Sequence, residues 1–281
     1  MPKIHVLASG SAGNCTLIET TAATLMVDCG TNLKTLRERA AAVGANLAKL
    51  KAILITHEHI DHLGGLGKAL RYLSKQGIYP DIFVDVVTQA ACAGRYFSDD
   101  KTVYHLRRFR VGECFGIDGF PGLEVQSFAT SHDVANPCGF VFDFTNAPES
   151  PTSDAGAGQN SCRIGYCTDT GLITAAARAA LDGCDALLLE ANHDPEMLRT
   201  GSYAPPLKER VGGEHGHLSN EQFGVALQEL AGPRLQAVCA MHLSHENNLP
   251  HLVADILDGL FADSSAATYV ASQSQPVSFS V

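Results

Sequence analysis

The sequence predicts an α/β protein in which two β-rich halves carry their helices on the outside. Short apolar runs of strand length alternate with helix-like segments along the 281 residues. Histidine and aspartate side chains directly follow several of these runs, and an α/β scaffold builds its sites at such strand ends. An apolar content of 45% with 18% charged residues suits a large buried core, so we expect residues 1–281 to form one domain.

The first half of the chain opens with strands and then alternates them with helices. Strands are expected at 4–8, 15–19, 24–28, 52–56 and 81–87. A turn rich in Ser and Gly, 9–14, separates the first two strands. Asn32 is a good N-cap for a helix that reaches about Val43, because its side chain can accept from the first-turn N–H groups. Two further helices are expected at 63–75 and 89–97.

The second half of the chain begins with β structure and ends with mixed elements. The stretch 102–144 is expected to be mostly β, and 146–161, rich in Pro, Ser, Gly, Ala and Asp, is expected to be a surface loop. Ser219 is a good N-cap with Gln222 three residues later, which is the capping-box pattern. Helices are expected at 172–182, 219–230 and 249–261, and closing strands at 268–271 and 277–281.

The most informative segment follows the strand expected at 52–56. It reads Thr56-His57-Glu58-His59-Ile60-Asp61-His62. Imidazole nitrogens and carboxylate oxygens are ligands that zinc and similar divalent ions prefer. His57 and His59 point the same way on an extended backbone, and Asp61 and His62 fall on the turn that enters the next helix. The segment therefore predicts ligands for two neighbouring metal ions.

Three further ligand candidates come later in the chain, each at or just after an apolar run. They are His132, Asp169 and His242, after the runs 123–128, 164–167 and 237–241. A histidine cluster on a protein surface would not require such partners. Their presence in this order favours a metal site at the rim of a sheet.

With these residues the sequence resembles the metallo-β-lactamase-fold hydrolases over nearly its whole length. The resemblance implies an αββα sandwich, with two β-sheets flanked by helices, and two divalent metal ions, zinc or manganese. One ion would take His57, His59 and His132. The other would take Asp61, His62 and His242, with Asp169 as the bridge. The ions would supply a hydroxide as the nucleophile.

Three segments indicate which branch of these hydrolases the chain resembles. Glu190 in Leu188-Leu189-Glu190-Ala191, His217 in Gly216-His217-Leu218-Ser219 and the His242-Leu243-Ser244 segment are similar to motifs of tRNase Z-like phosphodiesterases. In those enzymes the glutamate orients a histidine that protonates the leaving oxygen. The resemblance thus implies Asp61, Glu190 and His217 as catalytic residues.

A closer resemblance is to the bacterial YycJ/WalJ family. It rests on seven motifs in order: 9–14, 56–62, 131–133, 168–171, 190–198, 216–220 and 242–248. The family is linked to 5′-to-3′ exonuclease activity on DNA and to DNA repair, so the expected partner is nucleic acid, with DNA favoured, or another phosphodiester. The alternatives are a hydrolase of a small ester, thioester or lactone, and an RNA-directed phosphodiesterase.

Supporting residues are expected around this centre. His193 and Asp133 are candidates to hold ligand imidazoles in the right tautomer. Backbone N–H groups of the 9–14 turn can form an anion-binding concavity. The expected phosphate-binding side chains, which would hold a terminal 5′ phosphate at the turn, are Ser9, Ser11, Asn14 and Ser244.

Charge and cysteine usage set further limits. A net charge of −10 leaves few cations for nucleic acid, and these are grouped. The groups are Arg107, Arg108 and Arg110, expected to be solvated, and Arg199, Lys208 and Arg210, which lie between two site-like segments. Nine scattered cysteines, no signal peptide and no apolar stretch near the ~18 residues of a membrane span favour a cytoplasmic protein with reduced thiols. The native metal and the oligomeric state stay open.

Overall fold

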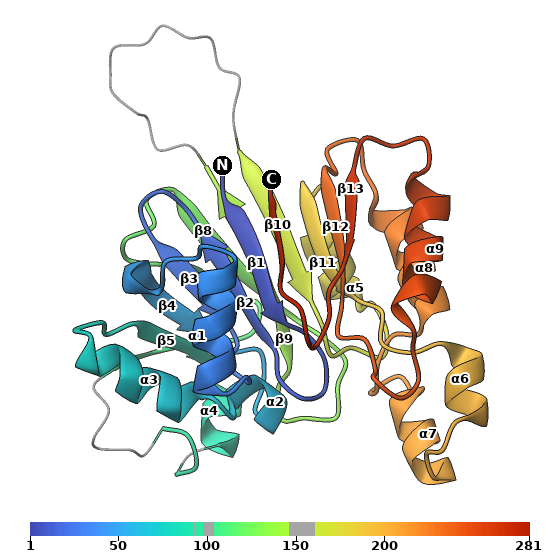
Figure 1. Cartoon of the computed structure of the whole chain (residues 1–281), viewed down its shortest axis with the longest axis horizontal. Helices are drawn as coiled ribbons and strands as arrows, with labels where there is room; N and C mark the ends of the chain where they lie inside the picture. Colours follow the sequence, from blue (N-terminus) through green and yellow to red (C-terminus); the bar gives the residue numbers. More distant parts are fainter. Residues whose placement is uncertain (93, 98–103, 146–160) are drawn as a thin grey trace, which may run out of the picture.

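Two mixed β-sheets lie at the centre of the structure (Figure 1). The computed structural model describes residues 1–92, 94–97, 104–145 and 161–281, and within these ranges each sheet has seven strands. The first sheet has the order β14-β1-β2-β3-β4-β5-β6 and the second β13-β12-β11-β10-β9-β8-β7. The predicted α/β fold of two sheets flanked by helices is confirmed.

Each sheet combines antiparallel and parallel pairs. The strands of the first sheet are β1 (Lys3–Ala8), β2 (Cys15–Glu19), β3 (Thr24–Val27), β4 (Leu50–Leu54), β5 (Asp81–Asp85), β6 (His105–Phe109) and β14 (Val277–Ser280). Those of the second sheet are β7 (Cys114–Gly116), β8 (Leu123–Ala129), β9 (Cys138–Phe144), β10 (Cys162–Cys167), β11 (Ala186–Glu190), β12 (Ala237–Met241) and β13 (Ala267–Val270). Strands β3 to β6 run parallel to one another, as do β10 to β13, and the other pairs are antiparallel.

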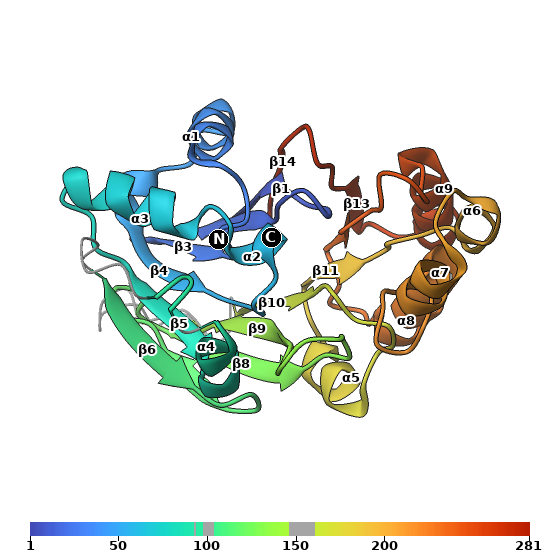
Figure 2. The same cartoon turned by 90° about the horizontal axis from the view of Figure 1, so that it is seen from below.

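Helices cover the outer face of each sheet (Figure 2). The helices of the first half are α1 (Leu33–Ala42), η1 (Leu47–Lys49), α2 (Ile60–Leu63), α3 (Leu66–Lys75) and α4 (Val86–Ala91). Those of the second half are α5 (Ala175–Leu181), α6 (Pro195–Thr200), α7 (Pro205–Val211), α8 (Asn220–Leu230) and α9 (Pro250–Phe261). Helices α1 and α3 pack on the first sheet, and α5, α8 and α9 pack on the second.

The largest apolar cluster lies between the sheets. Ile4, Val27 and Leu54 of the first sheet meet Phe140 and Tyr166 of the second, and all five are nearly inaccessible to solvent. Two further clusters lie under the helices, one on each outer face. The sandwich therefore has four layers with three apolar interfaces, which fix the two sheets relative to each other.

Most sequence-predicted elements are present, and the differences have local causes. The helix expected at 63–75 is divided into α2 and α3 at Gly64–Gly65. A Cβ at Gly65 would lie 1.8 Å from the Thr31 carbonyl oxygen, so close backbone packing requires glycine there. Helix α4 begins earlier than expected, because Asp85 caps the N–H groups of Val87 and Thr88.

Two short helices, α6 and α7, were not predicted from the sequence. Both begin with a proline in the first turn, which is a sequence signal of a helix start, and Asp194 also caps α6. The capping box of Ser219 and Gln222 at α8 is confirmed. The loop expected at about 146–161 lies outside the described residues except for Ser161.

The fold brings the ends of several strands to one edge. Strands β3 and β4 run parallel in one sheet, and β10, β11 and β12 run parallel in the other. The polar residues that follow these strands therefore meet at the open edge of the sandwich. All nine cysteines are free thiols, as expected. Within the described ranges, no helix has the length and apolar character needed to span a membrane.

Candidate metal centre

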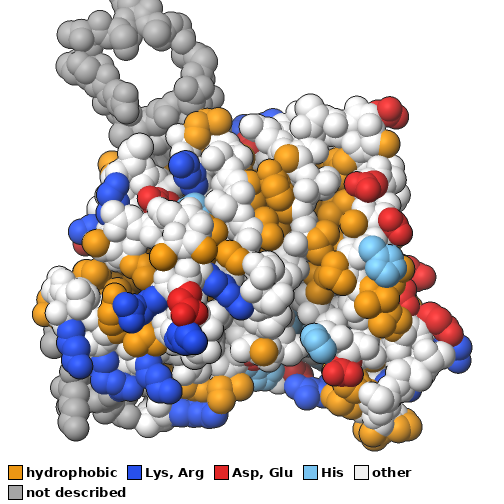
Figure 3. Space-filling model, viewed as in Figure 1, with side chains coloured by type: hydrophobic (Ala, Val, Ile, Leu, Met, Phe, Trp, Pro, Cys, Tyr) orange, Lys and Arg blue, Asp and Glu red, His pale blue; other side chains and the backbone are white. Residues whose placement is uncertain are grey.

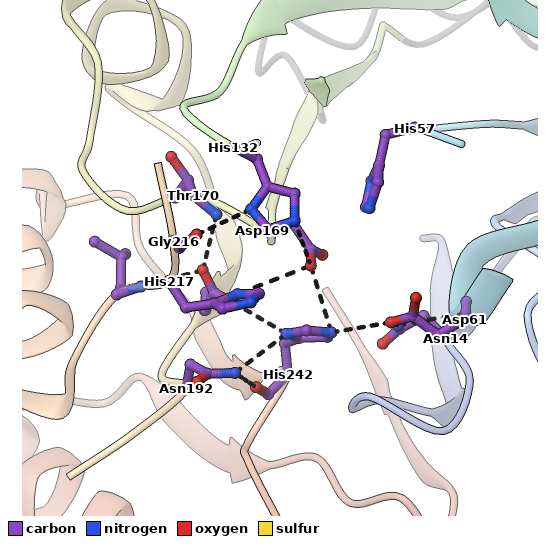
Figure 4. A network of polar contacts seen from close by, with 12 residues as sticks. Asn14, His57, Asp61, His132, Asp169, Thr170, Asn192, Gly216, His217 and His242 are labelled. Atoms are coloured by element: carbon purple, nitrogen blue, oxygen red, sulfur yellow. Dashed lines mark hydrogen bonds and ion pairs between the residues drawn. The ribbon is translucent and has the colours of Figure 1, made fainter. Parts of the chain in front are cut away.

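The residues that the sequence singled out as ligands converge at this edge. His57 and His59 lie in the loop after β4, and Asp61 and His62 lie in α2. The others follow strands of the second sheet: His132 after β8, Asp169 after β10 and His242 after β12. The structure brings these side chains together, as predicted. Figure 4 shows His57, Asp61, His132, Asp169 and His242 of this set.

The side chains form groups that are compact enough to hold a metal ion. One potential ligand atom from each member lies within 4.8 Å of the others in the group His57, His59 and His132. The same holds for the group Asp61, His62 and His242. These two groups are the ligand sets expected for two ions.

Asp169 lies between the two groups. Its Oδ1 atom is 3.9 Å from His132 Nε2 and 3.5 Å from His242 Nε2. Its Oδ2 atom is 3.3 Å from His62 Nε2. One carboxylate therefore reaches atoms of both ligand sets, as a bridging ligand must.

Several ligand atoms are buried without a hydrogen-bond partner. Among the described residues these include His57 Nε2, His242 Nε2 and Asp169 Oδ2, all turned into the cluster. A buried polar atom without a partner costs roughly 1–3 kcal/mol. Three such atoms at the cluster fit divalent cations, which would satisfy them. The donor set of the centre is consistent with divalent-metal binding.

A buried carboxylate, Asp28, orients the first ligand loop. Its Oδ2 atom lies 2.7 Å from His62 Nδ1 and accepts from the Thr56 hydroxyl at 2.9 Å. Its Oδ1 atom accepts from the Thr56 backbone N–H at 2.9 Å. The Thr56 hydroxyl in turn lies 3.0 Å from His57 Nδ1. With Nδ1 engaged, His57 and His62 present Nε2 to the centre.

Glu190 performs the same task on the other side. Its Oε1 atom lies 2.8 Å from His217 Nδ1 and 3.0 Å from His242 Nδ1. Its Oε2 atom accepts from the backbone N–H groups of Thr170 and Leu218. The carboxylate is wholly buried and fully hydrogen-bonded, so the two rings that it holds are fixed relative to each other. Figure 4 shows these rings, His217 and His242, side by side.

Backbone strain concentrates at the same residues. Among the described non-glycine residues, Asp28, Asp169 and His242 have φ values of 58°, 56° and 57°. The left-handed region is uncommon for residues other than glycine, although Asp and His tolerate it better than most. Each such residue costs on the order of 1–3 kcal/mol, and strain of this kind is typical of functional sites.

The electrostatics suit a cation. Burial holds the pKa of His57 well below its usual range, with His62 and His132 lowering it further, so this imidazole is neutral and able to bind metal. Burial alone would also lower the pKa of His242. The carboxylates around it, Asp169 first, instead raise its pKa to about 10. The carboxylates thus make this half of the centre strongly negative.

Of the two residues expected to support the ligands, Asp133 lies beside a candidate ligand and His193 has a ring nitrogen without a partner among the described residues. Asp133 Oδ1 lies 3.5 Å from His132 Nε2, and its other oxygen pairs with Arg210. The atom that orients His132 is instead the Gly216 carbonyl oxygen, 3.0 Å from Nδ1. His193 is buried, and its Nδ1 has no hydrogen-bond partner among the described residues.

Three of the four expected phosphate-binding residues are buried, and one is exposed. Ser9 Oγ accepts from the His242 backbone N–H at 2.7 Å, and Ser244 Oγ accepts from Asn247 N. Asn14 accepts from Gly10 N, and its Nδ2 atom lies 3.0 Å from His62 Nε2. Ser11 alone among the four is exposed, and it lines a cleft beside Asp61.

The grouped arginines and lysine mostly have protein partners. Arg107 pairs with Asp81, Arg199 pairs with Glu196, and Lys208 donates to the Arg199 carbonyl oxygen. These three cations are therefore engaged at the protein surface.

Sequence reasoning missed Asp28, Thr56 and the Gly216 carbonyl. A weak signal existed for Asp28, since it is a lone carboxylate at the end of an apolar strand. Its link to His62 spans 34 positions in the chain and depends on β3 and β4 being neighbours. The Gly216 carbonyl has no side-chain signal at all.

Comparisons with known proteins agree with this geometry. Residues 23–242 match the family described as the beta-lactamase superfamily domain. The chain is 34% identical to exodeoxyribonuclease WalJ of Streptococcus pneumoniae over 252 residues, 89% of this chain and 84% of the relative. It is 31% identical to exodeoxyribonuclease YycJ of Bacillus anthracis over 250 residues, 88% of this chain and 84% of the relative.

A solved structure shows the same fold. The metallo-beta-lactamase fold protein YhfI from Bacillus subtilis superposes with a TM-score of 0.67 at 16% identity, covering 99% of this chain and 100% of that one. The chain therefore belongs to the beta-lactamase superfamily and, within it, to the family of the WalJ and YycJ proteins.

Proposed function

We propose that this protein is a two-metal phosphodiesterase that degrades DNA as a 5′-to-3′ exonuclease. The observation that carries the proposal is the Glu190–His217 pair at the rim of the metal centre, 2.8 Å apart. An acid at this position serves a leaving group that needs a proton, as the alkoxide of a phosphodiester does. The WalJ and YycJ relatives are named exodeoxyribonucleases, which supports DNA as the substrate.

The ligand assignment follows the two groups of side chains. One ion would be held by His57, His59 and His132, and the other by Asp61, His62 and His242, with Asp169 shared. When bound, zinc or manganese would provide a water of lowered pKa and neutralise charge on the phosphoryl oxygens. Asp28 and Glu190 keep the imidazoles in the required orientation before substrate arrives.

His217 is the general acid in this proposal. Glu190 engages its Nδ1 atom, so Nε2 is the atom that carries the proton to the leaving oxygen. The ring lies 4.9 Å from the His132 ring and 5.3 Å from the His242 ring, and its side chain is 18% exposed. It is thus close to both ligand sets and still open to substrate. A positioned acid contributes roughly 10²- to 10⁴-fold in rate.

The function is tested with end-labelled substrates. Protein reconstituted separately with zinc and with manganese is given DNA and RNA strands, with and without a 5′ phosphate. We expect progressive shortening of DNA from the 5′ end, faster on the phosphorylated strand. Rapid cutting of a closed circular single strand, or turnover of a thioester or lactone in preference to any phosphodiester, would overturn the proposal.

The acid is tested by His217→Ala. We expect this variant to keep its metals and to hydrolyse bis-p-nitrophenyl phosphate, whose leaving group departs without a proton. Its activity on DNA should fall by roughly 10²-fold or more. His251→Ala, an exposed histidine on α9, is the matched control. Equal losses on both substrates would show that His217 does not donate the proton.

A further inference from the structure

A groove leads away from the metal centre between α1 and α3. Its first part is a cleft of ≈ 350 Å³ lined by Ser11, Asn32, Ile60, Asp61 and Lys68, among others. Because Asp61 is a candidate ligand, this cleft borders the centre. Figure 4 shows Asp61 and Asn14 on one side of His242 and His217 on the other, so the cleft lies on the side away from the proposed acid.

A second cleft lies farther along the same two helices. It has a volume of ≈ 510 Å³, and its lining includes Lys34, Arg37, Glu38 and Tyr72. Lys34 follows Asn32, the cap of α1, by two residues, and Tyr72 follows Lys68 by about one turn of α3. We call the two clefts together the α1–α3 groove.

The α1–α3 groove differs in charge from the rest of the chain. Helices α1 and α3 carry six Lys and Arg and a single acidic residue, Glu38, whereas the whole chain has 20 basic and 30 acidic residues. Lys34, Arg37 and Lys68 are exposed. Figure 3 shows Lys and Arg side chains gathered over α1 and α3, and Asp and Glu side chains along the opposite edge near α9.

The groove also offers flat and apolar contacts. The Arg37 guanidinium stacks over the Tyr72 ring, with its carbon 4.8 Å from the ring centroid. Ile60 is 63% exposed although it is large and apolar, and it lines the cleft next to Asp61. Cations that alternate with aromatic or apolar surfaces are typical of sites for single-stranded nucleic acid, where phosphates and bases bind to different groups.

We propose that the α1–α3 groove binds the body of a single-stranded nucleic acid, with Lys68, Arg37 and Lys34 contacting successive phosphates. The inference rests on the nuclease function proposed above. His217 marks the side where the leaving oxygen departs. The two halves of the strand extend from the phosphorus in different directions, so the half that keeps the phosphate extends away from His217. The groove lies on that side, so a phosphate beside the exposed Ser11 hydroxyl would be internal, and not the terminal 5′ phosphate that the sequence predicted at the 9–14 turn.

The groove is tested with the variant Lys34→Ala/Arg37→Ala/Lys68→Ala. The matched control is Arg107→Ala/Arg199→Ala/Lys208→Ala, which removes three cations that have partners elsewhere on the surface. Binding of a dye-labelled phosphorothioate strand of about 30 nucleotides to the metal-loaded proteins is measured by fluorescence anisotropy at several salt concentrations. Turnover of DNA strands of increasing length and of bis-p-nitrophenyl phosphate is measured in parallel.

We expect the groove variant to bind the strand at least 10-fold more weakly than the wild type, and the control to bind it nearly as well. The slope of log affinity against log salt is negative, and its magnitude should decrease by about 2, since each lost phosphate contact removes about 0.7. Turnover of bis-p-nitrophenyl phosphate should not change. In the groove variant, KM should rise for long strands and should change little for tetranucleotides.

Two results would contradict the proposal that the groove binds the strand. One is an equal loss of binding in the control variant, and the other is a loss that does not depend on strand length. Failure of the proposed function looks different: the wild type would then bind the phosphorothioate strand through the groove and yet leave DNA uncut. Binding and cleavage thus report on the two proposals separately.

Discussion

Replacing Asp28 by asparagine should weaken metal binding without disturbing the fold. Asp28 is wholly buried and accepts or shares three hydrogen bonds, two with Thr56 and one with His62. Its φ of 58° lies in the left-handed region, which asparagine also tolerates well. The substitution therefore keeps volume and backbone, removes the negative charge and replaces one acceptor oxygen by an amide NH2 group, which cannot accept the hydrogen bond that holds the His62 imidazole.

The size of the effect follows from the role of the carboxylate. Removing a group that orients a metal-binding histidine typically costs 10- to 100-fold in metal affinity. This corresponds to about 1.4–2.7 kcal/mol at 25 °C. The upper part of the range is expected here, because Asp28 acts on His62 directly and on His57 through the Thr56 hydroxyl. Both ligand sets should therefore be weakened.

The measurement is competition for zinc and for manganese against a chelator of known affinity. The matched control is Asp185→Asn, a buried carboxylate that binds Arg234 and the Arg163 backbone N–H elsewhere in the second sheet. The control should lower the melting temperature and leave metal affinity unchanged. Unchanged metal affinity in Asp28→Asn, with the fold intact, would refute the orienting role.

Three further predictions follow from the same geometry. Asp169→Ala should lower metal occupancy at both sites in elemental analysis; full occupancy would remove Asp169 as the bridge. Gly30→Ala should destabilise the protein by on the order of 3 kcal/mol, since its Cβ would lie 1.5 Å from the Asp61 carbonyl oxygen, whereas Gly259→Ala in α9 should stabilise it by about 0.5–1 kcal/mol. Denaturant unfolding of the two variants compares them. Chelation should lower the melting temperature, by an amount equivalent to about 4 kcal/mol for each ion that was present at 1,000 times its Kd. A melting temperature unaffected by chelator would contradict a metal centre.

The cluster of candidate ligands could be predicted from the sequence because its signals are local. His57, His59, Asp61 and His62 are neighbours in the chain, and their spacing alone places them on one loop and the following turn. His132, Asp169 and His242 were recognisable because each directly follows an apolar strand. The Glu190–His217 pair was predicted from motif resemblance, and the structure places the two side chains 2.8 Å apart.

The sequence by itself determined the class of fold, most strands, and the residue types at the centre, since hydrophobic periodicity and ligand chemistry are properties of short segments. Only the tertiary structure decided which carboxylate holds which imidazole, because Asp28 meets His62 through the pairing of β3 with β4. The tertiary structure also decided that the side chains of Ser9 and Asn14 form hydrogen bonds within the protein. It further placed cations of α1 and α3 along the same groove. These contacts join residues tens to hundreds of positions apart, and the packing of whole elements sets them.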